Sequence, residues 1–179
     1  GVTGSAPHYT CYISYYSKDR AFAQQILRDL RALGVTCWSL PADLRGGRWV
    51  PETTTSDELG IWITDDVDRG IRYYDKLVVV VSEDSLANEH LREEISRGIR
   101  KQEETGAWLV TPVAISDAAY DQRNRNVRLL QLSKYLLFDF RGCEDPQVYG
   151  AALEKLHQSL LATEDASAGM APEEEEESP

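Results

Sequence analysis

Short apolar runs alternate with amphipathic stretches along the 179-residue chain. The run Leu77–Val81 is unbroken, β-branched and bounded by polar residues, which is typical of a strand buried on both faces of a parallel sheet. The other expected strands are residues 9–15, 35–38, 108–115 and 135–140. The expected helices are one that starts near Ser17 and ends at Gly34, and others at residues 66–73, 89–104, 127–132 and 148–160.

This alternation of strands and helices indicates an α/β fold with a parallel sheet covered on both faces. The pattern favours a flavodoxin-like three-layer sandwich with five parallel strands, which fits the order 2-1-3-4-5 although spacing alone does not determine order. The central run stops at Ser82 and passes within a few residues into a helix that carries acidic side chains. We therefore expect a functional site at the carboxyl edge of the sheet, near Ser82.

The first helix has the clearest local signals. Ser17 offers an N-cap hydroxyl and Asp19 an acid in the first turn. Gly34 is expected to end the helix in the left-handed conformation. The expected buried stripe consists of Phe22, Ile26, Leu30 and Leu33.

A long connection from Pro41 to Ile63 has the composition of a loop, and a loop of this length is more often functional or mobile than inert. Trp49 and Trp62 in this connection either stack on a flat ligand or pack on neighbouring side chains. Arg45 and Arg48 either bind phosphates through forked hydrogen bonds or are solvated loop charges.

The net charge of −11 is concentrated at the C-terminus, where residues 162–179 hold seven acidic side chains and no basic one. We expect this segment to be a disordered acidic tail, residues 1–8 to be a disordered or linker N-terminus, and residues 9–161 to form one domain. The composition of the rest of the chain does not indicate a basic patch, so nucleic acid is not an expected partner. No apolar stretch approaches the ~20 residues of a spanning helix, so no membrane is expected either.

The three cysteines, Cys11, Cys37 and Cys143, are far apart and no two have CxxC spacing. They are best explained as free thiols in a reducing compartment, which predicts a cytoplasmic protein. The three histidines are scattered along the sequence, and no metal site is predicted. The sequence also lacks the phosphate-binding, dinucleotide-binding and GxSxG motifs.

The helix expected at residues 89–104 presents one particular acid toward the sheet. Its buried stripe steps by four residues, through Leu91, Ile95 and Ile99. At about 100° per residue, Glu93 points away from this stripe, whereas Glu94 lies at its border and can face a cleft. His90 shares the flank of Glu94, so the two either share a hydrogen bond or a ligand, or form an exposed pair without consequence.

Together these segments resemble a Toll/interleukin-1 receptor (TIR) domain of the bacterial type over about residues 9–161. The resemblance rests on four pieces in the family's order. They are Tyr12-Ile13-Ser14-Tyr15 for the first-strand box, Gly34–Trp38 for the second strand, Asp43–Trp49 for the BB loop, and Val79–Ser82 followed by Ser85, Leu86 and Glu94.

This resemblance implies one of two activities. Some TIR domains hydrolyse NAD+ at the nicotinamide–ribose bond and release nicotinamide and ADP-ribose or a cyclic ADP-ribose. Other TIR domains only assemble with one another through the BB loop. In the enzymatic branch the essential glutamate aligns with Glu94, the residue that the helix angles select independently. NAD+ would then be the substrate, and no resident cofactor is expected.

The resemblance also implies a dinucleotide pocket with two residues after the first strand and two in the BB loop, which are Tyr16, Ser17, Arg45 and Trp49. Position alone adds Ser82 and His90 as candidate binding residues. The family often has Trp where this chain has His90, so a ring that stacks on the ligand is replaced by a smaller imidazole, which predicts slow turnover. The connection at residues 51–65 is longer than in a compact TIR domain, and Trp62 is a candidate to restore that aromatic wall.

TIR enzymes need neighbours, because the BB loop of one copy helps to complete the pocket of another. The expected partners are therefore NAD+ and other TIR domains, in a defence or signalling protein whose fused sensor domain is missing here. Gly1 in place of Met fits such a fragment. The main alternative is a non-catalytic interaction module that acts through residues 41–49. A nucleoside deoxyribosyltransferase-like enzyme is a third possibility, which the BB loop fits less well.

Overall fold

The computed structural model describes residues 7–41, 75–130 and 137–162. Within these segments five strands form one parallel sheet in the order β2-β1-β3-β4-β5, which confirms the expected flavodoxin-like arrangement. The strands are β1 (Cys11–Tyr15), β2 (Cys37–Pro41), β3 (Lys76–Val81), β4 (Val110–Ala114) and β5 (Phe138–Asp139). The helices are η1 (Ser17–Asp19), α1 (Arg20–Ala32), α4 (Glu83–Leu86), α5 (Glu89–Thr105), η3 (Asp117–Tyr120), α6 (Arg125–Leu129) and α7 (Pro146–Ser159).

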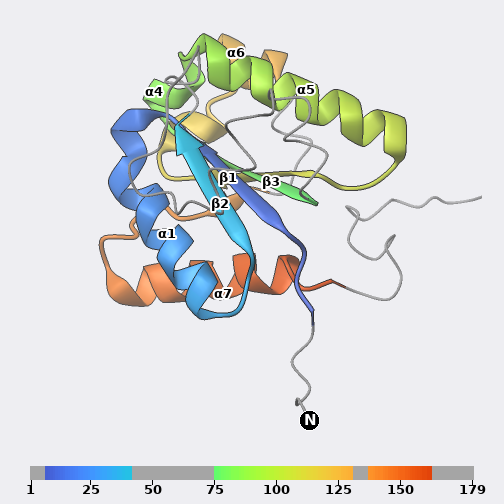
Figure 1. Cartoon of the computed structure of the whole chain (residues 1–179). Coiled ribbons are helices and arrows are strands. Elements are labelled where there is room, and N and C mark those ends of the chain that lie inside the picture. The colour runs from blue at the N-terminus through green and yellow to red at the C-terminus, as the bar shows by residue number, and fades with distance from the viewer. Residues whose placement is uncertain (1–6, 42–74, 131–136, 163–179) are drawn as a thin grey trace, which may run out of the picture.

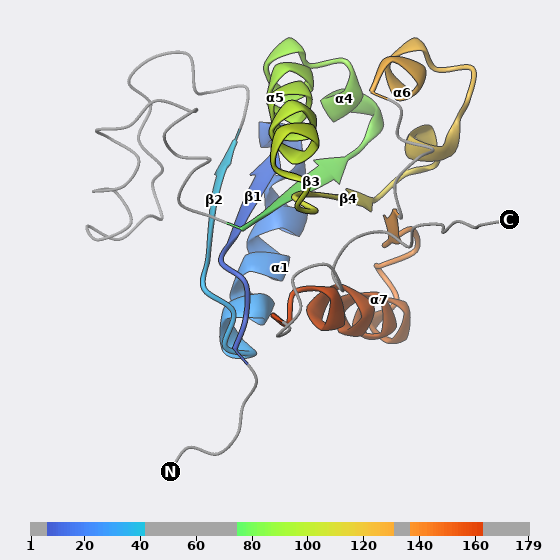
Figure 2. The same ribbon diagram turned by 90° about the vertical axis from the view of Figure 1, so that its right-hand side faces the viewer.

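Helices cover both faces of the sheet (Figure 1). Helices α1 and α7 lie on one face, and α4, α5 and α6 lie on the other (Figure 2). Successive residues of β3 alternate between the two cores, with Val78 on the α1 side and Val79 on the α5 side, so the whole strand is buried as expected. None of the described helices combines the length and apolar character needed to cross a bilayer.

Most expected elements are present with shifted ends. The central strand begins one residue earlier, at Lys76, and α5 ends one residue later, at Thr105. The second strand starts at Cys37 instead of residue 35, because the amide of Val35 still bonds to the carbonyl of Leu30 in the last turn of α1 (3.0 Å). The helix expected at residues 66–73 and the connection beyond Pro41 lie outside the described residues.

The prediction that Ser17 caps the first helix is wrong. Ser17 opens the short helix η1, and the N-cap of α1 is Asp19, whose side chain makes no cap hydrogen bond. The Asp19 carboxylate instead accepts a hydrogen bond from Ser82 Oγ (2.6 Å), at the end of β3. The Asp19 side chain, which could have capped its own helix, therefore binds a residue that is distant in the sequence.

The expected buried stripe of the first helix is also partly wrong. Leu33 is 43% exposed, because α1 ends at Ala32 and the chain turns away through Gly34. Gly34 has a φ of 96°, which confirms the left-handed residue predicted at this place. The buried face of α1 consists of Ala23, Ile26, Leu27 and Leu30.

Gly98 allows α5 to approach the sheet closely. A Cβ atom at this position would lie 3.0 Å from Leu77 Cδ2 and 3.0 Å from Val110 Cγ2. Both of those side chains are fully buried, so neither can move aside without disturbing the core. The absence of a side chain at Gly98 thus sets the distance between the helix and strands β3 and β4.

We predict that Gly98→Ala lowers the free energy of unfolding by about 1–3 kcal/mol, because the added methyl overpacks the core. Gly150→Ala is the matched control, since Gly150 lies in α7 with no atom within 4 Å of an added Cβ. The control should gain about 0.5–1 kcal/mol from higher helix propensity. Urea unfolding of both variants measures the difference, and equal stabilities would contradict this account of the helix–sheet contact.

The two ends of the described chain meet in a short antiparallel bridge. The backbone of residues 7–9 bonds to that of residues 160–162, with N···O distances of 2.9 and 3.0 Å. Beside this bridge, His8 Nε2 and His157 Nε2 lie 3.0 Å apart, and the two rings stack with 5.1 Å between their centroids. Burial and the neighbouring His157 lower the pKa of His8 from its ordinary value of 6.5.

This lowered pKa predicts that acid weakens the fold. Below about pH 6.5, His8 binds a proton more readily in the unfolded chain than in the folded protein. The free energy of unfolding should therefore decrease as the pH is lowered. Urea unfolding from about pH 7.5 to about 5.5 tests this, with His8→Gln as the variant that cannot titrate. The variant should lose stability less steeply than the parent protein, and superimposable pH profiles would refute the assignment.

Candidate functional site

Glu94 is buried between α5 and the sheet, and its neighbour Glu93 is exposed. The N-cap of this helix is Asn88, whose side chain accepts a hydrogen bond from the amide of Leu91 (2.9 Å). Leu91 and Ile95 are each 1% exposed and pack into the core on this face, which turns Glu94 toward β1. The prediction from the helix angles, that Glu94 faces inward and Glu93 points away from the core, is therefore confirmed.

Ser14 is the partner of Glu94 on the sheet. Its side chain lies on the α5 side of β1, as the alternation of the strand requires, and Ser14 is 0% exposed. Ser14 Oγ donates a hydrogen bond to Glu94 Oε1. A hydrogen bond to a carboxylate is among the stronger ones in proteins, so it favours one orientation of this side chain.

Ser82 and Asp19 form a second link at the same edge of the sheet. Ser82 Oγ donates to Asp19 Oδ2 (2.6 Å) and accepts a bond from the amide of Ser85 (3.0 Å). The amide of Ser82 in turn donates to Ser85 Oγ (2.7 Å), which completes a capping box at the start of α4. These bonds connect the segments that follow β1 and β3 and cap the N-terminus of α4.

The remaining candidate residues are only partly placed. Tyr16 and Ser17 directly follow β1 and are half-buried, with the Lys18 ammonium 6.0 Å from the centre of the Tyr16 ring. His90 belongs to α5, one turn before Glu94. Arg45 and Trp49 lie outside the described residues. The structure thus brings Glu94 to β1 and Ser82 to Asp19, and the ligand-binding roles expected for these residues remain predictions.

Sequence reasoning missed both partners, Ser14 and Asp19. A signal for Ser14 was present, since a hydroxyl inside an otherwise apolar strand needs a hydrogen-bond partner when it is buried. Joined to the inward direction of Glu94, that rule would have suggested the pair. Asp19 carried no comparable signal, because its place in the first turn of a helix already explained it.

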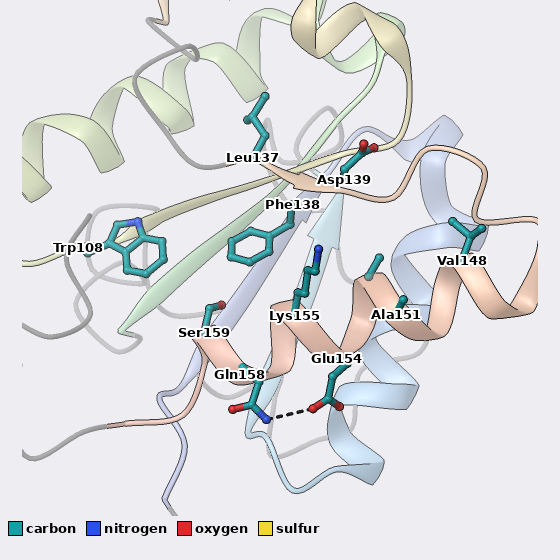
Figure 3. Close-up of a pocket in the computed structure, with 11 residues that line it drawn as sticks. Trp108, Leu137, Phe138, Asp139, Val148, Ala151, Glu154, Lys155, Gln158 and Ser159 are labelled. Carbon is teal, nitrogen blue, oxygen red and sulfur yellow. Dashed lines mark hydrogen bonds between the residues drawn. The ribbon is translucent and has the colours of Figure 1, made fainter. Parts of the chain in front are cut away.

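A sizeable cavity lies on the other face of the sheet (Figure 3). It measures about 760 Å³ and lies between α7, β5 and Trp108, with a mostly apolar lining that includes Phe138 and Val148. Its carboxylates already have partners, since Asp139 pairs with Arg141 (2.8 Å) and Glu154 accepts a bond from Gln158 (3.1 Å). The volume suits a small molecule, but the buried acid of this fold lies elsewhere.

Glu93 occupies a different setting from Glu94. It lines a groove of about 580 Å³ on the outer side of α5, together with Arg92 and Arg97. Within the described residues, no group of three or more His, Cys, Asp or Glu side chains is arranged to hold a metal ion. The one buried acid among the described side chains is Glu94, and it is the centre of the candidate site.

Comparison with known proteins supports one family. A family model described as "TIR domain" matches residues 11–157. The fold is similar to the TIR domain of the Toll-related receptor TRR-2 from Hydra magnipapillata, at 14% identity and a TM-score of 0.54, over 85% of this chain and 98% of that one. It is also similar to a metazoan TIR-STING receptor from C. gigas, solved with 2′,3′-cGAMP, at 16% identity and a TM-score of 0.52, over 90% of this chain and 42% of that one. No curated protein sequence matches the chain.

We predict that Ser14→Ala lowers the free energy of unfolding by about 1–3 kcal/mol, because the buried Oε1 of Glu94 loses the hydrogen bond that Ser14 donates. Ser96→Ala is the control, since Ser96 is an exposed residue of α5. Its effect should stay within about 0.5 kcal/mol. Urea unfolding measures both, and a loss no larger than that of the control would show that the hydrogen bond does not hold Glu94.

Proposed function

The chain belongs to the TIR domain family, and from this premise we propose that it hydrolyses NAD+ at the nicotinamide–ribose bond. The observation that supports this most is the Glu94 carboxylate, which is 1% exposed and oriented by Ser14 at the β1 side of α5. Of the two adjacent glutamates, the one that the family resemblance makes essential is the one that the fold buries. A surface pair would have offered no such distinction.

The chemistry suits a buried carboxylate. When the bond from ribose C1′ to the pyridinium nitrogen breaks, its electron pair passes to nicotinamide, which leaves neutral, while positive charge grows on the sugar. Glu94 stabilises that charge and binds the ribose hydroxyls, and water attacks C1′ and loses a proton to give ADP-ribose. Attack by an atom of the adenine instead of water would give a cyclic product.

The proposal assigns the other candidates to binding. Tyr16 and Ser17 follow β1 at the edge where Glu94 lies, and we assign them to contacts with the dinucleotide. Arg45 and Trp49 would contribute a phosphate contact and a stacking ring. The hydroxyl proton of Ser82 is engaged by Asp19, so Ser82 is proposed to shape the pocket and to accept a bond rather than donate one.

The burial of Glu94 also supports activation by assembly. A carboxylate that is 1% exposed cannot meet a nucleotide until its surroundings rearrange. We propose that self-association with other TIR domains, brought about by a fused sensor in a cytoplasmic defence or signalling protein, causes that rearrangement. An isolated domain should accordingly be tested at high protein concentration.

The decisive experiment compares Glu94→Gln with Glu93→Gln in concentrated protein incubated with NAD+. Glutamine keeps the volume of Glu94 and an oxygen that accepts the Ser14 bond, but it removes the charge. We expect Glu94→Gln to lower the rate of nicotinamide release by ~10²–10³, because a preorganised charge is lost from the transition state. Glu93→Gln should retain most of the activity, since Glu93 is exposed on the outer side of α5.

Nicotinamide, ADP-ribose and its cyclic form are separated by chromatography, and circular dichroism confirms that each variant is folded. Similar rates for the two variants would refute the role of Glu94.

The second candidate is a non-catalytic interaction module that acts through residues 41–49. The burial of Glu94 is compatible with this function too, because a buried carboxylate bonded to Ser14 also suits a purely structural role. Substitution of Gly46 or Trp49 tests the surface of such a module, and incubation of the unsubstituted protein with NAD+ discriminates between the two functions. A module would lose self-association in these variants and would leave NAD+ untouched at every protein concentration.

A further inference from the structure

Two of the three cysteines lie side by side at the amino edge of the sheet, opposite the edge discussed above. Cys11 is the first residue of β1 and Cys37 is the first residue of β2, and the two are register partners in the parallel pairing. Neither is in a disulfide, and both face the core on the α1 side of the sheet. Neighbouring strands lie about 4.7–4.9 Å apart, which falls within the Cα separation of about 4.4–6.8 Å that a disulfide spans.

The two thiols contact each other. A hydrogen bond between the side chains of Cys11 and Cys37, which favours the protonated Cys11 thiol, and complete burial raise the pKa of Cys11 well above its ordinary value. The resting form is therefore a neutral dithiol with low intrinsic reactivity. Contact between the sulfur atoms also means that little side-chain movement separates this dithiol from a disulfide.

The backbone holds the pair in place. The amide of Cys11 donates to the carbonyl of Thr36 (2.9 Å), which fixes the register of the two strands next to the thiols. Arg31 in α1 donates two hydrogen bonds to the carbonyl of Cys37 (3.0 and 2.7 Å). A bond between the sulfur atoms would thus join two residues whose backbones are already constrained.

We propose that Cys11 and Cys37 form a redox modification site that closes to an intramolecular disulfide, with a small disulfide such as oxidised glutathione as the oxidant. The Cys37 thiolate attacks a sulfur of the oxidant and releases one molecule of thiol. The Cys11 thiolate then displaces the second thiol from the mixed disulfide, so the protein loses two electrons and two protons and the oxidant gains them. The new bond fastens β2 to β1 and closes a loop around α1.

The order of attack follows from the sheet. Strand β2 is an edge strand that pairs with β1 alone among the described strands, so opening of this edge exposes Cys37 before Cys11. In the closed state Cys37 is 2% exposed and Cys11 is 0% exposed. Oxidation is therefore slow and is limited by opening of the edge strand. This site is independent of the proposed hydrolase activity.

The test exposes the whole folded chain to oxidised glutathione and follows the intact mass and the free thiols. The parent protein should lose the mass of two hydrogen atoms, and non-reducing peptide mapping should link Cys11 to Cys37. Cys143→Ala should behave in the same way, because Cys143 is the third and half-buried thiol. Cys37→Ala should not form this link, and a reductant should restore the parent mass.

Thermal unfolding supplies a readout that does not depend on the alanine variants. The oxidised parent protein should melt at a higher temperature than the reduced one, and the reductant should remove the difference. The proposal is overturned if the folded protein only acquires a glutathione adduct on Cys143. It is also overturned if both buried thiols are still reduced after prolonged exposure to oxidised glutathione, or if the Cys11–Cys37 link forms only in urea.

Discussion

The hydrogen bond between Ser14 and Glu94 is the interaction on which the rest of this site depends. A carboxylate that is 1% exposed would be too costly to bury without a donor, and the hydroxyl of Ser14, which is 0% exposed, equally needs a partner. The bond between them gives each group a partner and joins α5 to β1. This hydrogen bond would hold a catalytic carboxylate and a structural one equally well. The two functions are therefore separated by Glu94→Gln, which removes the charge and keeps the shape of the side chain.

The order of the strands explains why these residues meet. Because β3 lies directly beside β1, the carboxyl ends of both strands share one edge. Ser82 reaches Asp19 across that edge, and Glu94 reaches Ser14 from α5, the second helix after β3. Gly98 contributes from a distance, because the close approach of α5 to β3 and β4 sets how deeply the glutamate one turn earlier can be inserted.

The opposite edge has a different character. There Lys76 is held by Tyr9 and Trp108, with its ammonium 4.4 and 4.5 Å from the two ring centres and 2.7 Å from the carbonyl oxygen of Trp108. Burial lowers the pKa of Lys76 to about 8. The adjacent dithiol of Cys11 and Cys37 adds a second unusual group to this edge. The buried acid and these groups are thus separated by the length of the strands.

The sequence by itself determined what depends on periodicity. The buried run 77–81, the extent of α5 and the inward direction of Glu94 follow from side chains repeating along a strand or helix, and the structure agrees on each. The left-handed Gly34 follows from backbone freedom in the same local way. Only the tertiary structure decided that Asp19 binds Ser82 rather than capping its own helix, that Leu33 is left outside the core, and that Ser14 receives Glu94. In the cases of Asp19 and Ser14, two segments far apart in the chain compete with or complete a local preference, and the energy of that contact depends on a distance that no sequence spacing contains.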